Sequence, residues 1–266
     1  MDAATELVQA GDTKLYVEQS GRGPAIVLVP GAGGDAGQYA GLAAELSPNH
    51  LVIAYDRRGN SRSPRTDDWA TTSVAQHAGD VLALLEALDL TNVTLFGNST
   101  GAVVALAAAL SGHPSVVELI THEPTLFGVL ADPDGAVASV QPVIAAGVEQ
   151  GGLPGGAEAF LRFAAGEGFE RLPADAIERI RGNAQTMLEA EFGAFASWQP
   201  DVAELRNLDI PVLVLSAEQT APFFVEAAEW LAAQLGTETV KVPGGHMGFL
   251  EDPADFARRM GTRARK

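Results

Sequence analysis

Two short stretches of the chain carry residue types that together could hydrolyse an ester. The first, Gly97-Asn98-Ser99-Thr100-Gly101, places a serine between two glycines, after an apolar β-type run and before a helix rich in small residues. Such a turn holds the serine in a strained backbone conformation and exposes its hydroxyl. The second, Pro243-Gly244-Gly245-His246, offers an imidazole, whose ordinary pKa suits proton removal at neutral pH. We therefore predict Ser99 as the nucleophile and His246 as its general base. The alternative is that Gly97-Asn98-Ser99-Thr100-Gly101 is an ordinary turn without a catalytic serine.

Attack on an ester places negative charge on the carbonyl oxygen, which needs backbone N–H donors nearby. Thr100, which follows the predicted nucleophile, supplies one of them at the start of a helix. The segment Pro30-Gly31-Ala32-Gly33-Gly34 follows a buried strand and can supply the other, and we expect Ala32 to be the donor. A dinucleotide-binding loop is the alternative for this segment, but Ala36 stands where the third glycine of that pattern belongs.

Continuous apolar runs predict strands that are covered on both faces of a parallel sheet. They are Ala25–Val29, Leu51–Tyr55, Asn92–Phe96, Val116–Thr121, Ile210–Leu215 and Glu238–Val242. Apolar and polar residues alternate in Lys14–Gln19, which predicts an antiparallel edge strand. Predicted helices lie between these runs, at Gln38–Leu46, Val74–Leu88, Thr100–Leu110 and Pro222–Leu235. The alternation predicts an α/β fold with a doubly wound sheet.

One long interval, from about residue 123 to about residue 207, has no strand-like run and predicts a helical insert on the sheet. The predicted domains are a core of residues 1–123 and 208–266 and a helical cap of residues 124–207. The cap has more large apolar side chains than its own core needs, so we expect some of them to face a ligand cavity. Phe127, Phe195 and Trp198 are the candidates for substrate contacts. Packing within the cap is the alternative role for each.

The composition limits the partners of the protein. Seventeen basic against 34 acidic residues give a formal net charge of −17, which repels nucleic acid and anionic membranes. The absence of cysteine excludes disulfides and thiolate chemistry. The first residues lack the basic and apolar regions of a secretory signal, and the apolar run from Ala102 to Leu110 is too short to span a bilayer. We expect a cytoplasmic protein, and monomer and homodimer both stay open.

The order of these segments resembles the α/β-hydrolase superfamily over nearly the whole chain. The resemblance rests on residues 25–34, the Asp-Arg-Arg-Gly-Asn-Ser-Arg-Ser segment that begins at Asp56, the turn around Ser99, the helical insert and Gly244-Gly245-His246. It implies an α/β-hydrolase fold, with a mostly parallel doubly wound sheet and a helical cap inserted after the sixth strand. In this superfamily the segment at Asp56 is a structural turn, so Asp56 is not a catalytic candidate. Pro30 differs from the histidine that is common at the start of the oxyanion loop.

The resemblance also bears on the acid that orients the histidine. The superfamily usually carries this acid after the next-to-last strand, at a position where the present chain has Thr220. A hydroxyl cannot stabilise an imidazolium as a carboxylate can, so the acid is either the nearby Glu218 or a residue elsewhere. Glu123 follows an earlier strand, and its position is similar to that of the triad glutamate in the zearalenone-type lactone hydrolases. The resemblance implies Glu123 as the third member of the triad, with Glu218 as the alternative.

These residues predict a serine hydrolase that cleaves an apolar ester or lactone through an acyl-enzyme and needs neither cofactor nor metal. Two alternatives stay open. A hydrolase of carbon–carbon bonds is one, because Gly-Asn-Ser elbows also occur in enzymes that resemble meta-cleavage-product hydrolases. A hydrolase-like receptor that binds a small molecule with little or no turnover is the other.

Overall fold

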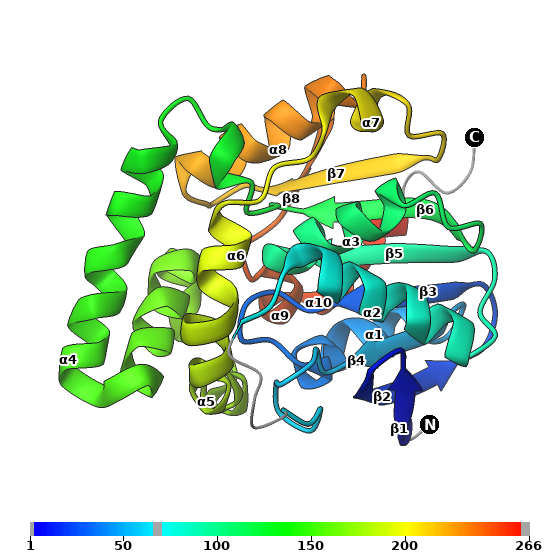
Figure 1. The fold of residues 1–266 in the computed structure, drawn as a ribbon, viewed down its shortest axis with the longest axis horizontal. Coiled ribbons are helices and arrows are strands. Elements are labelled where there is room, and N and C mark those ends of the chain that lie inside the picture. Colours follow the sequence, from blue (N-terminus) through cyan, green and yellow to red (C-terminus); the bar gives the residue numbers. More distant parts are fainter. Residues whose placement is uncertain (1–2, 66–70, 262–266) are drawn as a thin grey trace.

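A sheet of eight strands organises the fold in the computed structural model, which describes residues 3–65 and 71–261 (Figure 1). The strands are β1 (Ala4–Ala10), β2 (Thr13–Gly21), β3 (Ala25–Val29), β4 (Leu51–Tyr55), β5 (Val93–Asn98), β6 (Val116–His122), β7 (Val212–Ala217) and β8 (Thr239–Val242). Their order across the sheet is β1-β2-β4-β3-β5-β6-β7-β8. β2 pairs antiparallel with β1 and with β4, and the other neighbours are parallel. The predicted, mostly parallel α/β sheet is confirmed.

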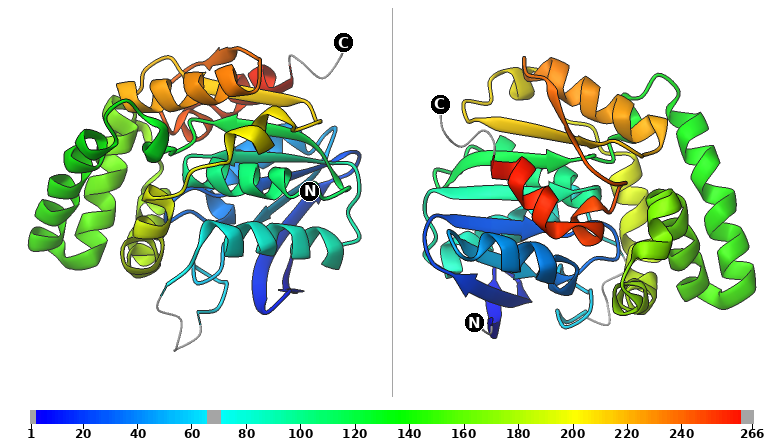
Figure 2. Two further views of the ribbon diagram at one scale, coloured as in Figure 1. Left: turned by 45° about the horizontal axis from the view of Figure 1, so that its top comes forward. Right: turned by 180° about the vertical axis from the view of Figure 1, so that it is seen from behind.

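Helices cover both faces of this sheet. They are η1 (Ala36–Tyr39), α1 (Ala40–Leu46), α2 (Val74–Ala87), α3 (Thr100–Leu110), α8 (Pro222–Gln234), α9 (Gly248–Glu251) and α10 (Pro253–Gly261). Helices α2, α3 and α8 lie on one face, and α1 and α10 lie on the other (Figure 1 and Figure 2). The sheet is therefore doubly wound, as the alternation of strands and helices predicts.

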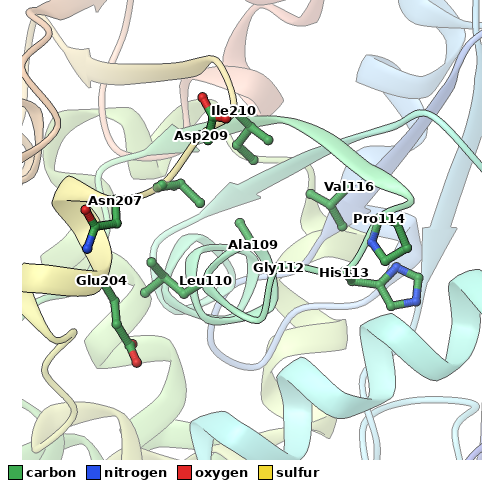
Figure 3. A pocket seen from close by; sticks show the side chains of 11 residues that line it. Ala109, Leu110, Gly112, His113, Pro114, Val116, Glu204, Asn207, Asp209 and Ile210 are labelled. Carbon is green, nitrogen blue, oxygen red and sulfur yellow. The ribbon is translucent and has the colours of Figure 1, made fainter.

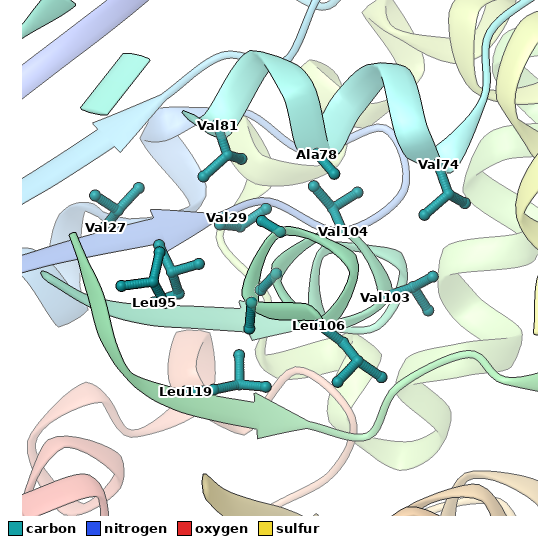
Figure 4. Close-up of a cluster of buried hydrophobic side chains, with 14 of the residues drawn as sticks. Val27, Val29, Val74, Ala78, Val81, Leu95, Val103, Val104, Leu106 and Leu119 are labelled. Atoms are coloured by element: carbon teal, nitrogen blue, oxygen red, sulfur yellow. The ribbon is translucent and has the colours of Figure 1, made fainter. Parts of the chain in front are cut away.

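Side chains of β3 alternate between two apolar clusters, one on each face of the sheet. Val27 and Val29 pack with side chains of α2 and α3, such as Val104 (Figure 4). Ile26 and Leu28 belong to the cluster on the other face, which α1 and α10 cover. All five residues of β3 are buried, which agrees with its unbroken apolar sequence.

The regular structure between β6 and β7 is entirely helical. Its elements are η2 (Phe127–Val129), α4 (Pro133–Ala165), η3 (Gly166–Arg171), α5 (Ala174–Gly182), the π-helical turn η4 (Thr186–Glu191), α6 (Phe192–Ala196) and α7 (Val202–Arg206). This insert stands at one end of the sheet, after the sixth strand, as predicted (Figure 1). Helix α4 bends at Gly151 and Gly152, where the φ angles are −147° and 66°. The domain boundaries at residues 124 and 207 stay a prediction.

No helix within residues 3–65 and 71–261 is both long enough and apolar enough to cross a bilayer.

The edge of the sheet differs from the prediction. Lys14–Gln19 lies within β2, which pairs on both sides and is not an edge strand. The edge strand on this side of the sheet is β1, which has no clear apolar pattern because only Val8 and Ala10 of its seven residues are buried. Its place is set by backbone pairing along its whole length, and such pairing leaves little trace in the sequence.

Gly101 should not tolerate a side chain. A Cβ at this position would lie 2.1 Å from the carbonyl oxygen of Val29, because α3 starts directly against the end of β3. We expect Gly101→Ala to lower the free energy of unfolding by about 1–3 kcal/mol, the usual range for overpacking, as measured by urea denaturation. Gly79→Ala in α2 is the matched control, because a Cβ there meets nothing within 4 Å, and it should be neutral or stabilising. Equal stability of the two variants would contradict the close approach.

Candidate active site

The predicted catalytic segments lie together at the carboxyl ends of parallel strands. Ser99 follows β5, Glu123 follows β6, and the loop that carries His246 follows β8. The glycine-rich segment with Ala32 follows β3. Loops converge at this end of an open parallel sheet, which is where such folds carry their ligand sites. Ala32, Ser99 and His246 consequently line one cavity, although they are far apart in the chain.

The turn at Ser99 is strained and firmly held. Ser99 has φ 54° and ψ −127°, which is an unusual conformation for a residue with a side chain. Its N–H donates to the carbonyl oxygen of His122 at 2.9 Å, and its own carbonyl oxygen accepts from the N–H of Ala102 at 3.1 Å. These bonds tie the serine to β6 on one side and to α3 on the other. The strain is therefore offset by the surrounding backbone.

A buried hydrogen bond joins Glu123 and His246. The distance from His246 Nδ1 to Glu123 Oε2 is 2.6 Å, and both side chains are almost fully buried. Oε1 of Glu123 accepts from the N–H of Ala217 at 2.8 Å, and Oε2 accepts from the hydroxyl of Thr220 at 3.0 Å. Three donors thus hold this carboxylate in one orientation. Its backbone has φ 47°, so the acid, like the serine, sits on a strained residue.

The protonation of this pair follows from the geometry. Burial alone would raise the pKa of Glu123, but the hydrogen bond from His246, the imidazole of His122 and the N–H of Ala217 lower it to about 2. The carboxylate is therefore ionised at neutral pH and can only accept hydrogen bonds. It follows that His246 carries a proton on Nδ1 and, when neutral, has a free lone pair on Nε2. A general base needs that arrangement.

Glu218, the alternative acid, lies elsewhere. Its side chain is exposed, and its N–H donates to the carbonyl oxygen of Val242 in the ladder between β7 and β8. Thr220, which occupies the position where the resemblance places an acid, donates its hydroxyl to Glu123 instead. The structure thus brings Glu123 to His246, and it brings Thr220 to Glu123. The resemblance to the superfamily draws attention to position 220 but does not predict the hydrogen bond between Thr220 and Glu123.

The ring of His246 is held by its neighbours. Phe224, at the start of α8, stacks on it with a centroid distance of 3.8 Å and an interplanar angle of 10°. No motif in the sequence marks Phe224, which the prediction missed. The ring of His122 lies behind, at 6.1 Å, and burial lowers the pKa of His122 to about 4, so this ring is neutral at neutral pH. Neither ring nitrogen of His122 has a hydrogen-bond partner within the described part of the chain.

Ala32 and Thr100 present free backbone N–H groups beside Ser99. Thr100 is the first residue of α3, so its N–H has no acceptor within the helix. The N–H of Ala32 donates to no acceptor among the residues that the structure describes. Both residues line the same small cavity, and the positive end of α3 favours an anion there. The pair has the composition of an oxyanion hole.

The space around Ser99 is narrow. One cavity of about 20 Å³ is lined by Ser99 and His246. The cavity beside Thr100 has the same volume, and Ala32 and Phe160 line both cavities. Within the described residues, the Ser99 hydroxyl makes no hydrogen bond, and catalytic hydrogen bonds often tighten only when a ligand binds. Binding pockets for small molecules usually measure about 300–1,000 Å³. Both cavities are therefore much smaller than a usual binding pocket.

The three predicted substrate contacts fall in different places. Phe127 and Phe195 line the cavity beside Thr100. Trp198 is partly buried, packs against the apolar cluster that contains α2, α3 and α8, and lines neither of the two cavities. A role for these side chains in binding stays a prediction.

A larger hollow of about 460 Å³ lies away from the catalytic segments (Figure 3). Leu110 at the end of α3 and Val116 at the start of β6 line it, whereas Ser99 precedes the first residue of α3. The length of α3 separates the two places by about 16 Å. The hollow is thus no part of the candidate active site.

Residues 3–65 and 71–261 contain no cluster of three or more His, Asp or Glu side chains able to hold a metal.

Comparison with known proteins gives matches over most of the chain. A sequence model described as the alpha/beta hydrolase family matches residues 26–259. The chain is 29% identical to the uncharacterized hydrolase YraK of Bacillus subtilis (strain 168) over 258 residues, which are 95% of this chain and 93% of that protein. It is 28% identical to a zearalenone hydrolase of Bionectria ochroleuca over 250 residues, 91% of this chain and 90% of that one. A solved structure of an alpha/beta hydrolase from Sphaerobacter thermophilus shares 26% identity with a TM-score of 0.64, covering 90% and 91% of the two chains.

Neutralising Glu123 should be costly for activity, whereas neutralising Glu218 should not. Glu123→Gln keeps the shape but removes the charge that stabilises protonated His246, so we expect kcat to fall by roughly 10²- to 10⁴-fold with little change in KM. Glu218→Gln is the matched control and should cost less than about tenfold. Steady-state kinetics on the best ester substrate measure both. The reverse ranking would show that Glu218 is the acid.

Acid should destabilise the protein in part through His122. Burial lowers its pKa from 6.5 to about 4, so between these values the unfolded chain binds a proton that the folded chain does not. The contribution to stability is complete above pH 6.5 and is lost as the pH falls toward 4. The phenyl ring of His122→Phe cannot bind this proton, and the substitution removes no side-chain hydrogen bond to any residue that the structure describes.

Urea denaturation between pH 8 and pH 4 measures this effect. We expect the loss of unfolding free energy over that range to be smaller in His122→Phe by on the order of 3 kcal/mol. Part of the acid sensitivity should persist, because burial also lowers the pKa of His77 well below its ordinary value. Identical pH profiles for the two proteins would contradict a neutral, buried His122.

Proposed function

Because the chain belongs to the alpha/beta hydrolase family, we propose that it is a serine hydrolase that cleaves an apolar ester or lactone through an acyl-enzyme. The observation that carries the proposal is the 2.6 Å hydrogen bond between His246 Nδ1 and the buried carboxylate of Glu123. His246 and Ser99 line the same cavity. The hydrogen bond gives the histidine the tautomer and orientation that a general base requires.

The proposed reaction has two halves. Ser99 Oγ attacks the carbonyl carbon while His246 Nε2 takes the hydroxyl proton, and the N–H groups of Ala32 and Thr100 bind the oxyanion. Collapse of the tetrahedral intermediate breaks the bond to the alcohol oxygen, which receives the proton from His246. Water then attacks the acyl-enzyme by the same route, again with His246 as base, and releases the acid and free Ser99. Glu123 stays ionised and stabilises the imidazolium in both halves.

The surroundings of Ser99 support an apolar substrate. Most of the wall of the cavity beside Thr100 is apolar, formed by the aromatic rings of Phe127, Phe160, Phe192 and Phe195 and by Met187. Glu191, which is paired with Arg57, also lines it. An apolar acyl or alkyl group would bury its surface there. The similarity to a zearalenone hydrolase, together with the resemblance to lactone hydrolases of that type, favours including lactones among the substrates.

Removal of the Ser99 hydroxyl tests the mechanism. Turnover is measured by proton release on a panel of p-nitrophenyl esters and aliphatic, aromatic and macrocyclic lactones. We expect Ser99→Ala to lower kcat by about 10⁴-fold or more, because triad residues act as a unit. A fluorophosphonate probe should label wild-type Ser99, as located by peptide mass spectrometry. Ser111→Ala, at the far end of α3, is the matched control and should keep both activity and labelling.

Two outcomes would contradict this proposal. Near-normal turnover by Ser99→Ala would exclude the acyl-enzyme. Tight binding of a panel compound with neither turnover nor probe labelling of wild type would instead indicate a hydrolase-like receptor.

A further inference from the structure

The peptide group that joins Gly31 and Ala32 is anchored through its carbonyl oxygen. The Gly31 oxygen accepts a hydrogen bond from Arg57 Nη2 at 3.1 Å and another from the N–H of Gly34 at 3.0 Å. A trans peptide is planar, and its C=O and N–H point in opposite directions. The bonds to the Gly31 oxygen therefore fix the direction of the Ala32 N–H, which is the proposed oxyanion donor.

This peptide group needs an anchor because it adjoins a glycine. It lies between Gly31 and Ala32, and Gly33, the residue after Ala32, has φ 62°. Glycine populates both halves of backbone conformational space, so rotation about the bonds of Gly31 can turn this peptide at little cost. A hydrogen bond from a charged donor is stronger than one from a neutral donor, and Arg57 supplies such a bond from the buried interior.

Arg57 is itself oriented by the helical insert. Its Nη2 donates to Glu191 Oε2 at 2.7 Å, and the two side chains are 0% and 2% exposed. The other oxygen of Glu191 accepts from Asn60 Nδ2 at 3.1 Å. Glu191 is the last residue of the π-helical turn η4, and such turns occur often at functional sites. One nitrogen of Arg57 thus links the insert to the oxyanion loop.

The remaining nitrogens of Arg57 argue against a purely structural role. Within the described residues, Nε and Nη1 are buried and have no hydrogen-bond partner. Unsatisfied buried donors lower stability, and a buried ion pair is often no more stabilising than apolar side chains of similar size. His77, which lies 3.6 Å from Glu191, is held neutral, because burial first and then Arg57 and Arg58 lower its pKa. Arg57 is thus the cation that pairs with Glu191.

The insert also holds the oxyanion loop at a second point. Asn183 Nδ2 donates to the carbonyl oxygen of Gly33 at 2.9 Å. Thr186 Oγ1 donates to the carbonyl oxygen of Gly59, in the segment that carries Arg57, at 2.6 Å. Both donors come from the part of the insert that ends at Glu191. The loop and the arginine that anchors it are therefore fixed by the same stretch of the insert.

We propose that Arg57 and Glu191 are positioning residues for the oxyanion hole: Glu191 of the insert orients Arg57, and Arg57 holds the Gly31 peptide so that the Ala32 N–H faces the reacting oxygen. This inference rests on the proposed serine hydrolase mechanism. It makes the insert part of the catalytic apparatus as well as a cover for the substrate. Arg57 acts through the backbone of Gly31 and Ala32. Glu191, whose side chain also lines the cavity beside Thr100, acts by orienting Arg57.

The test removes both charges together, because a lone buried charge would destabilise the fold. In the double variant Arg57→Met/Glu191→Gln, the glutamine can still accept from Asn60, and the methionine fills the space without a donor for Gly31. The matched control is Arg58→Met/Asp80→Asn. Arg58 lies in the same segment and donates to Asp80 at 2.7 Å. In the described part of the chain, no hydrogen bond or ion pair joins either residue of this buried pair to the oxyanion loop.

Loss of one oxyanion donor lowers kcat by about 10²- to 10³-fold. We expect the Arg57/Glu191 double variant to show a fall in that range with KM within about threefold of wild type. Affinity for a boronic acid, which mimics the tetrahedral intermediate once bound to Ser99, should fall by a similar factor. The Arg58/Asp80 control should keep kcat and boronic acid affinity within about threefold of wild type.

The inference is overturned if the Arg57/Glu191 variant keeps wild-type kcat, or if both double variants lose activity to the same extent. If the Arg57/Glu191 double variant does not fold, the single variant Glu191→Asp provides the test. It keeps the negative charge but moves the carboxylate away from Arg57 by one methylene. A fall in kcat of about tenfold at unchanged KM is then expected, and unchanged kcat would count against the inference. If Ser99→Ala keeps its turnover, the serine mechanism itself is overturned. If Ser99→Ala is inactive but the Arg57/Glu191 variant is fully active, only the positioning role is overturned.

Discussion

The hydrogen bond between Glu123 and His246 is the contact on which the candidate site depends. It places a proton on Nδ1 of His246, so that Nε2 of the neutral ring is the nitrogen left as an acceptor. The bond exists only because β6, β7 and β8 lie side by side and bring their carboxyl ends together. Ladder bonds continue to the site itself, as the N–H of Glu123 donates to the carbonyl oxygen of Leu215. The central sheet thus determines the chemistry.

Burial gives the two carboxylates near Ser99 separate tasks. Glu123 is satisfied by three donors and faces the imidazole, while Glu191 is paired with Arg57 behind the oxyanion loop. Electrostatic interactions are stronger in such dry surroundings than in water, so each carboxylate needs its own partner. The helical insert provides one of these carboxylates, Glu191, and most of the aromatic walls. It therefore contributes to the geometry of the site as well as to its shape.

Much of this arrangement could be predicted from the sequence, and the rest could not for physical reasons. Buried strands and the turn at Ser99 are encoded locally, in apolar runs and in glycines that permit close backbone approach. Glu123 was predicted because its place after a strand is similar to that of the triad glutamate in the zearalenone-type lactone hydrolases, with Glu218 as the alternative. The pairing of Arg57 with Glu191 has no local signal, because the two residues are 134 positions apart and meet only when the insert packs on the sheet. The edge strand β1 escaped prediction for a similar reason, since its partner strand defines it.

The tautomer of His246 tests the role of Glu123 most directly. Nitrogen-15 NMR of protein labelled in its histidine side chains reports which ring nitrogen is protonated, and the His246 signals are assigned by their loss in His246→Asn. At a pH where the ring is neutral, we expect the proton on Nδ1, at low field because of the short bond to Glu123, and an unprotonated Nε2. A proton on Nε2 with a bare Nδ1 would contradict the catalytic arrangement, since Ser99 would then have no base.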